Sequence, residues 1–453
     1  MVGKKIIIIG AGLAGLSAGC YLQMNGYQTQ ILEAHNLPGG LCTAWKRKGY
    51  TIEGAIHGLL GSSNANPFYG LWSELIEMDK IEFVNYDVQA VFEFEDKQRF
   101  YLYADLDKLE KYMKELSPQD GKVIEEFING VKRVQKLQMP VGKPRELMNL
   151  FDYLKMVSYL PVLSFMKKWL NISADEYAKQ FKDPFLRKVV RYFSSPVLFE
   201  MFVLYAMDLK ASGYPTIGSL EFAKLFEKRY LSLGGKICYN SKVQKIIEEN
   251  HKAVGAKLEN GATFYADIII SAIDGRTVLF DMLERKYVSK ELSDAYQNMK
   301  LNSSRVQVSL GINRAFKNEP HLIKYVLDKP FKLSDGNTFQ SIDVQIFNQI
   351  QTLAPAGKTL IEVQFETNNG AYWINLRSDD LAKYHLVKDA LAKEVIAVLE
   401  AKMGNIEDNV EMIDVATPAT YNRYTGNWKG SIQGWANEKI FEKNPFRKEL
   451  AGL

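Results

Sequence analysis

The chain has few of the residues that hold together small secreted folds or metal sites. Only three of its 453 residues are cysteines, Cys20, Cys42 and Cys238. They are widely spaced and odd in number, which argues against a disulfide framework and a zinc site. The sequence also shows no Ser/His/Asp or Cys/His set typical of hydrolases and no cluster of metal ligands. We expect no metal and a reducing, cytoplasmic compartment.

A strong charge of one sign is also missing. The formal net charge is +4, which is too small at this length to indicate a nucleic-acid partner. The apolar fraction of 47% and the charged fraction of 24% are typical of a globular protein. The length predicts two or three lobes. The oligomeric state does not follow from the sequence.

One uncharged stretch, residues 6–32, resembles a signal peptide or a membrane span. Five glycines and a polar second half argue against both interpretations. A βαβ unit explains the glycines by their positions. Lys5–Ile9 is a short β-branched run typical of a buried parallel strand.

Gly10, Gly12 and Gly15 follow this strand with the G-x-G-x-x-G spacing. The first permits a tight turn, the second lets the backbone lie close to a pyrophosphate, and the third lets the helix pack on the strand. The pyrophosphate would lie at the helix N-terminus, where the dipole favours negative charge. Asn25-Gly26 ends the predicted helix.

A second strand, Thr29–Leu32, is followed by Glu33. A carboxylate there can accept hydrogen bonds from a ribose 2′-hydroxyl and would repel a 2′-phosphate, so NADP is a poor ligand. The alternative is a glycine-rich loop without a ligand. The strand, the helix and the acid about twenty residues further on together favour dinucleotide binding.

The next residues distinguish FAD from NAD. The pair Gly39-Gly40 lies just past Glu33 and resembles the second glycine motif of the flavoprotein superfamily of amine oxidases, protoporphyrinogen oxidase and phytoene desaturases. Many members have an arginine after this pair, where this chain has Leu41. The stretch Gly49–His57, with Glu53 before Gly54, is similar to phytoene-desaturase-like proteins, including carotenoid isomerases and retinol saturases.

The resemblance implies a cofactor site and one tentative catalytic residue. His57 would lie near the flavin and tune it or move a proton, or it is a hydrogen-bonded structural histidine. Cys42 is a reactive thiol or, more simply, a buried filler. In relatives the residue at the position of Val243 meets the adenine. The residues expected to bind FAD are Gly10, Ala11, Gly12, Leu13, Ala14, Gly15, Glu33, Ala34, Gly39, Gly40, Leu41, Ile56, His57, Val243 and Ala272.

The remaining pattern predicts interleaved domains. Residues 82–103 alternate as antiparallel strands do, and residues 106–209 are helical in pattern. Within the latter, Tyr153–Leu170 is apolar but interrupted by Pro161, and three interpretations stay open: helical core, a wall of the substrate cavity, or a patch that docks on a membrane. Pro196–Met207 is expected to line the same cavity.

The chain then returns to the cofactor domain. A helix is predicted at Leu220–Leu233, followed by strands at residues 236–239, 243–248, 253–258 and 263–271. Residues 302–414 are expected to alternate strands with one helix near Leu386–Lys402. Arg423 would touch substrate or make a structural pair.

Nothing after Trp435 resembles the last FAD-binding segment of the family, so we expect the chain to be a fragment of a slightly longer protein.

The expected fold is α/β. A Rossmann-like FAD domain (1–80, 213–300, 415–453) is interleaved with a mixed-sheet substrate domain (81–105, 301–414) and a helical lobe (106–212).

The resemblance implies an FAD-dependent, phytoene dehydrogenase-like oxidoreductase. Its substrate would be a long, apolar, conjugated lipid, similar to a carotenoid or retinoid, that is desaturated, saturated or isomerised. Two alternatives stay open: an amine or porphyrinogen oxidase, and a non-catalytic lipid-binding protein of the Rab GDP-dissociation inhibitor type. Fold membership alone does not select among them.

Overall fold

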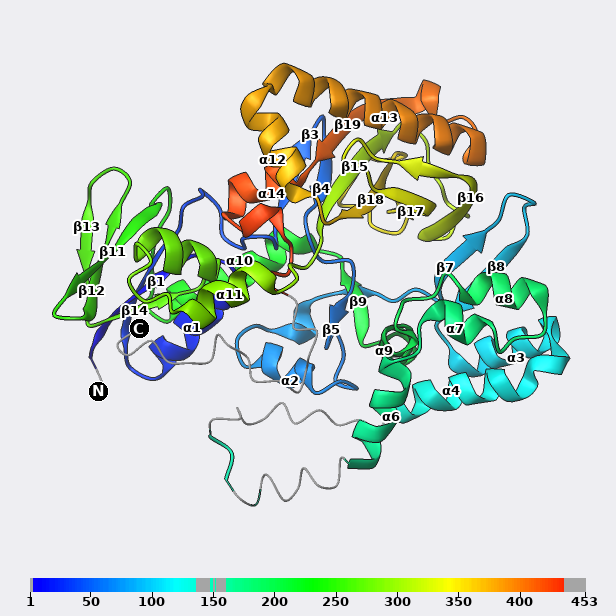
Figure 1. Ribbon diagram of the computed structural model, residues 1–453, viewed down its shortest axis with the longest axis horizontal. Helices are drawn as coiled ribbons and strands as arrows, with labels where there is room; N and C mark the ends of the chain where they lie inside the picture. Colours follow the sequence, from blue (N-terminus) through cyan, green and yellow to red (C-terminus); the bar gives the residue numbers. More distant parts are fainter. Residues whose placement is uncertain (1–2, 136–146, 150, 152–159, 436–453) are drawn as a thin grey trace. The chain divides into compact units, whose positions relative to one another are not determined.

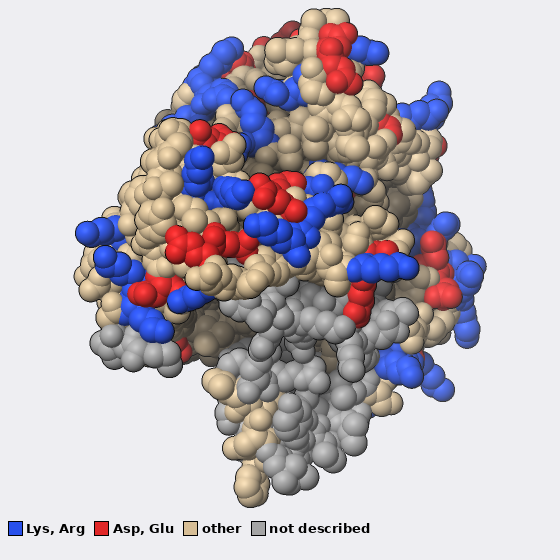
Figure 2. Space-filling view, turned by 60° about the vertical axis from the view of Figure 1, so that its left-hand side comes forward, with Lys and Arg blue, Asp and Glu red and all other residues tan. Residues whose placement is uncertain are grey.

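A computed structural model describes residues 3–135, 147–149, 151 and 160–435. The chain forms two compact units. Unit 1 comprises Met1–Ile56, Ile217–Lys317 and Lys329–Leu453, and unit 2 comprises His57–Thr216 and Asn318–Asp328. Side chains of both charges are interspersed on the face shown in Figure 2.

Unit 1 contains a parallel sheet formed by segments far apart in the chain (Figure 1). Its strands run in the order β10 (Lys236–Cys238), β2 (Gln28–Leu32), β1 (Lys5–Ile9) and β14 (Ile268–Ser271). The isoleucines of β1 are buried, as expected for a strand covered on both faces. Helices α1 (Leu13–Met24) and α10 (Gly218–Ser232) pack against each other. The predicted βαβ unit is therefore confirmed.

An antiparallel sheet follows β10 along the chain. Its strands are β11 (Val243–Glu249), β12 (Lys252–Leu258) and β13 (Thr263–Tyr265). The prediction of one strand over residues 263–271 is wrong, because the segment forms two strands that belong to different sheets. β13 pairs with β12, whereas β14 pairs with β1. Between them Asp267 turns the chain, and its carboxylate accepts a hydrogen bond from the backbone nitrogen of Lys5.

In a further, antiparallel sheet, four strands of unit 1 lie in the order β19 (Val410–Ala416), β15 (Ser304–Ile312), β18 (Thr359–Thr367) and β17 (Thr338–Ile346). Helix α13 (Leu381–Met403) lies along it (Figure 1). The prediction of one helix here is wrong, because α12 (Gly370–Asp379) precedes α13. A tertiary contact holds α12: the buried Trp373 indole donates a hydrogen bond to the carboxylate of Asp335.

Four smaller elements also belong to unit 1. They are the hairpin β3 (Ala44–Arg47) and β4 (Tyr50–Glu53), and the helices α11 (Lys290–Asn298) and α14 (Pro418–Thr425). The β3–β4 hairpin comes directly before residues 54–57, and α14 follows β19 along the chain.

Unit 2 is built around the hairpin β7 (Val88–Glu93) and β8 (Arg99–Tyr103), and the first half of β16 (Leu322–Lys332) pairs with β7. A small sheet has the order β5 (Leu59–Leu60), β9 (Ser212–Pro215) and β6 (Phe83–Val84). The α-helices in the described part of unit 2 are α2 (Phe68–Ser73), α3 (Leu106–Leu116), α4 (Gly121–Gln135), α6 (Leu160–Leu170), α7 (Ala174–Ala178), α8 (Pro184–Val190) and α9 (Val197–Asp208). Apolar side chains of the hairpin and of α3, α4, α6, α7, α8 and α9 form one core.

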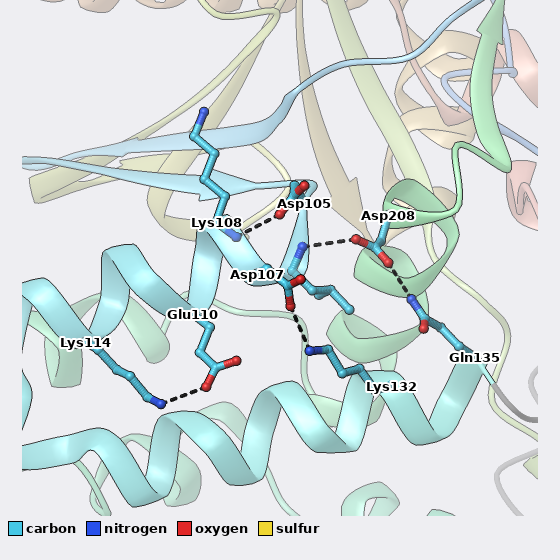
Figure 3. A network of polar contacts seen from close by, with 9 residues as sticks. Asp105, Asp107, Lys108, Glu110, Lys114, Lys132, Gln135 and Asp208 are labelled. Carbon is cyan, nitrogen blue, oxygen red and sulfur yellow. Dashed lines mark hydrogen bonds and ion pairs between the residues drawn. The ribbon is translucent and has the colours of Figure 1, made fainter.

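Polar contacts fix the ends of three of these helices (Figure 3). Asp105 caps α3 by accepting a hydrogen bond from the Lys108 nitrogen. Asp208, at the end of α9, accepts hydrogen bonds from the Leu106 nitrogen at 3.0 Å and from the Gln135 amide at 2.6 Å. This carboxylate therefore joins α9 to the start of α3 and the end of α4.

The apolar segment Tyr153–Leu170 lies partly outside the described residues. Its second half forms α6, and Pro161 stands in the first turn, where proline is tolerated. Within the described ranges no helix is long and apolar enough to cross a membrane. Pro196–Met207 corresponds to α9, which is mostly buried but exposes Phe199 and Val203. A cavity wall or a membrane contact at these helices stays a prediction.

Candidate functional site

A groove opens at the carboxyl ends of the parallel strands in unit 1. The chain passes from β1 to β2 and β10 on one side, while β14 lies on the other, so the strand order reverses beside β1. Open α/β sheets bind ligands at such a switch point. The segments that follow β1, β2, β10 and β14 all line the groove, whose volume is about 810 Å³.

Two glycine segments form one wall of this groove. Gly12 and Gly39 form a parallel β-bridge, and the Gly39 nitrogen donates a hydrogen bond to the Ala11 carbonyl at 2.8 Å. A Cβ atom on Gly12 would have no atom closer than 4.0 Å, so this face is open toward the groove. A Cβ atom on Gly15 would lie 2.0 Å from the Gly10 carbonyl oxygen, so Gly15 serves helix packing. The wall is a cradle in which backbone rather than side chains faces the groove.

Glu33 stands at the end of β2 with its carboxylate fixed in place. Oε2 accepts a hydrogen bond from the Ala11 nitrogen at 2.6 Å, and Oε1 accepts one from the His35 nitrogen at 2.8 Å. The residue is 9% exposed and lines the groove. An anchored carboxylate that still borders the groove can accept a further hydrogen bond from a ribose hydroxyl, because each of its oxygens has two lone pairs.

Most of the predicted cofactor residues meet in the groove. Those that line it are Gly10, Gly12, Leu13, Ala14, Glu33, Ala34, Gly39, Gly40, Leu41, Val243 and Ala272. Ala11 and Gly15 are buried behind the cradle. Ile56 is not among the lining residues, and His57 belongs to unit 2, so the groove does not include the tentative catalytic histidine.

The sequence analysis missed cationic residues of the groove. Arg377 from α12 and Lys242 after β10 line it together with Arg423 from α14. No sequence signal pointed to Arg377, because its helix was not predicted. The guanidinium of Arg423 lies 4.4 Å from the centre of the Tyr424 ring. These cations could balance the charge of a bound pyrophosphate.

A second cavity of about 240 Å³ adjoins the groove and shares Glu33, Gly40, Leu41 and Arg423 with it. Trp45 and Tyr421 contribute aromatic side chains to its lining, which also includes Gly54. Asp414 fixes one side by pairing with the Arg47 guanidinium at 3.3 Å and accepting a hydrogen bond from the Trp45 indole at 3.1 Å. An extended ligand could pass from the groove into this cavity.

Cys42 is held in a way that suits a structural residue. It is buried, and its thiol donates a hydrogen bond to the Ser219 carbonyl at 3.2 Å. Burial, with a smaller contribution from the Glu53 carboxylate, raises the pKa of the Cys42 thiol to about 12. The thiolate that would act as a nucleophile is therefore scarce at neutral pH.

Comparison with known proteins places these features in a family. The flavin containing amine oxidoreductases match residues 13–393. A chloroplastic prolycopene isomerase of an Oncidium hybrid cultivar is 24% identical over 447 residues, covering 94% of this chain and 74% of that protein. A 4,4'-diapophytoene desaturase of Methylomonas is 23% identical, covering 94% and 84%. A phytoene desaturase of Phycomyces blakesleeanus is also 23% identical, covering 96% and 77%.

Solved structures show the same fold. A putrescine oxidase mutant from a redesign of cofactor binding has a TM-score of 0.55 at 13% identity, covering 94% of this chain and 86% of that chain. An oxidoreductase from Methanosarcina mazei has a TM-score of 0.53 at 18% identity, covering 92% and 90%. These likenesses confirm the expected α/β fold class.

Proposed function

Because the chain belongs to the family of flavin containing amine oxidoreductases, we propose that it binds FAD in the groove and cavity of unit 1. The chain is a flavin-dependent oxidoreductase, as the sequence resemblance predicted. The observation that best supports FAD is the pairing of Gly12 with Gly39 beside the anchored Glu33. It gives a dinucleotide both a backbone cradle and a ribose acceptor.

The residues of the groove suit the parts of FAD. The amides near Gly12, at the start of α1, would bind the pyrophosphate, and Arg377 and Arg423 would balance its charge. Glu33 would hold the ribose, and Val243 would border the adenine. The cavity beyond Leu41 would take the part of the cofactor that reaches toward Gly54. When bound, the flavin would supply hydride transfer, and the chain would orient it and exclude water.

We propose a long, apolar, conjugated lipid as the substrate. The proposal is supported by the similarity of this chain to a prolycopene isomerase, a diapophytoene desaturase and a phytoene desaturase. These names cover isomerisation and desaturation, and the cofactor groove is compatible with both. We also propose that unit 2 supplies the apolar surface for the lipid and that His57 acts near the flavin. A peripheral contact with a membrane, through the helices of unit 2, would give such a lipid access.

The visible absorption spectrum of the purified chain, residues 1–453, tests the proposal. We expect a yellow protein, or a colourless one that turns yellow on reconstitution with FAD and binds FMN and NADP much more weakly. A protein that binds no flavin after reconstitution would overturn it and would favour a non-catalytic lipid-binding protein.

The substrate class is tested by adding candidate substrates, under anaerobic conditions, to the flavin-loaded protein in its oxidised or reduced form. The absorbance of the flavin is then recorded. Bleaching of the flavin by an acyclic polyene, or reoxidation of the reduced flavin by it, is the expected result. Bleaching by amines or a porphyrinogen, with none by polyenes, would assign the other chemistry of the family.

A further inference from the structure

A buried polar network in unit 1 joins the end of β4 and the start of α10 to strands β15 and β18. Its acidic members are Glu53, the last residue of β4, and Glu362 in the middle of β18, and neither side chain is exposed. Gln307 and Ser309 of β15 lie between them and are 1% exposed. Two carboxyl groups in one fully buried network are costly unless one of them carries a proton.

Glu53 fixes the turn that leads away from β4. Its Oε2 accepts hydrogen bonds from the Ser219 nitrogen at 2.9 Å and from the Ser219 hydroxyl at 2.5 Å. The same hydroxyl accepts a hydrogen bond from the Ile56 nitrogen at 2.9 Å. A Cβ atom on Gly218, which has a φ of +78°, would lie 2.7 Å from Glu53 Oε1. Residues 53–56 and the start of α10 are therefore held as one piece.

Glu362 connects to this piece through Gln307. The Gln307 amide nitrogen lies 3.0 Å from the Glu53 carbonyl oxygen and 3.1 Å from Glu362 Oε1, and it donates to both. The Ser309 hydroxyl also donates to Glu362 Oε1, at 3.2 Å. The side-chain Oε1 of Gln307 accepts a hydrogen bond from the hydroxyl of Tyr421 on α14, which lines the second cavity.

The charges around Glu362 favour its neutral form. Burial, with the Glu53 carboxylate as the next cause, raises the pKa of Glu362 to about 8. Tyr421 is another titratable group in this network, and burial raises the pKa of its hydroxyl. Arg305 on β15 and Asp414 on β19 act on Tyr421, and Arg305 donates a hydrogen bond to Gln364, which lies beside Glu362 on β18.

We infer that Glu362 is a positioning residue that keeps its proton at neutral pH in the folded protein and, through Gln307 and Glu53, sets the position of residues 53–56 at the cofactor cavity. Gly54 lines that cavity, so a shift of this segment would change the space open to the ligand. Loss of the proton would leave two buried carboxylates in one network and push the segment and β18 apart. The inference rests on the proposed function only where it concerns the bound flavin.

The test begins without flavin, with the melting temperature of the wild-type chain and its Glu362→Gln variant measured from pH 5 to pH 9. The pKa of a glutamic acid in an unfolded chain is about 4.3, which is lower than the pKa of Glu362 in the folded protein. The folded wild type therefore binds the proton more tightly, and its melting temperature should fall as the pH rises to about 8 and then level off. E362Q should lack this fall. Glu366→Gln, an exposed position on the same strand, is the control and should behave as wild type.

Two further measurements keep the outcome decisive. Glu53→Gln should move the fall in the melting temperature to lower pH, because it removes the neighbouring charge. If E362Q does not fold, the infrared band of a protonated carboxyl, recorded for wild type at pH 7 and lost at pH 9, replaces the comparison. A pH profile of E362Q equal to that of wild type, or absence of the infrared band at pH 7, would overturn the inference.

Flavin binding then links the network to the cavity. The wild type should bind FAD more weakly at pH 9 than at pH 7, and E362Q should bind it equally at both. If the wild type binds no flavin at either pH, the proposed function fails, whereas the melting curves still decide the role of Glu362. Equal pH dependence of binding in wild type and E362Q would refute the link to the cavity.

Discussion

The backbone nitrogen of Ala11, in the glycine-rich turn after β1, donates a 2.6 Å hydrogen bond to the carboxylate of Glu33 at the end of β2. The same carboxylate accepts a hydrogen bond from the His35 nitrogen. Its orientation is therefore set before a ligand binds, so little side-chain entropy is lost when a ribose hydroxyl is added. This arrangement ties the two halves of the dinucleotide fingerprint together.

Replacing Glu33 by alanine should weaken FAD binding by about ten- to a hundredfold, because a hydrogen bond to a charged group contributes about 1.5–3 kcal/mol. Isothermal titration or the quenching of flavin fluorescence measures the affinity. The matched control is Glu249→Ala, an exposed acid at the end of β11, which should bind FAD as wild type does. Equal affinities of E33A and wild type would contradict a ribose role.

Two glycines of the fingerprint should respond differently to one added methyl group. Gly12→Ala should leave the melting temperature nearly unchanged, because its Cβ would have no atom closer than 4.0 Å, but it should abolish tight FAD binding by filling the cradle. Gly15→Ala should lower the free energy of unfolding by at least about 2 kcal/mol, since its Cβ would lie 2.0 Å from the Gly10 carbonyl oxygen. Thermal melts and FAD titrations of both variants distinguish packing from binding. A stable G15A or a fully binding G12A would show that these roles are assigned wrongly.

The cations across the groove give a prediction about salt. Arg377→Gln should reduce FAD affinity and make it less sensitive to ionic strength, since one charge opposite the pyrophosphate is lost. Lys383→Gln, on an exposed position of the next helix, serves as the control. Titrations at low and high salt provide the measurement, and an unchanged salt dependence in R377Q would place the pyrophosphate elsewhere.

The parts of this fold that the sequence predicts are those with strong local signals. The run Lys5–Ile9 and the glycines at fixed spacing locate β1 and the start of α1, because a buried strand and a tight turn each restrict the residue types allowed. Local patterns do not predict the structure of residues 263–271, because their strands pair with distant segments of two different sheets. There the chain leaves one sheet at Tyr265 and enters another at Ile268, and no local pattern records that change of partner.

The candidate site divides in the same way. The glycine pair and Glu33 are visible in the sequence because their spacing along the chain is fixed. Arg377 is not, since α12 depends on the burial of Trp373 against Asp335 rather than on helix propensity. The buried Glu362 is also invisible, because an acid within an apolar strand shows its neighbours only after β15 and β4 are placed beside it.

The three cysteines should differ in reactivity in the folded protein. Burial raises the pKa of the Cys20 thiol to about 11 and that of the Cys42 thiol to about 12, so both stay protonated and covered at pH 8. Cys238 is only partly buried, and its sulfur accepts a hydrogen bond from the Gln30 amide. An aromatic disulfide reagent should therefore label one thiol quickly in the native chain and the other two only after unfolding. The Cys238→Ser variant should lose the fast phase. Fast labelling of a second thiol in the native wild type would contradict the burial of Cys20 or of Cys42.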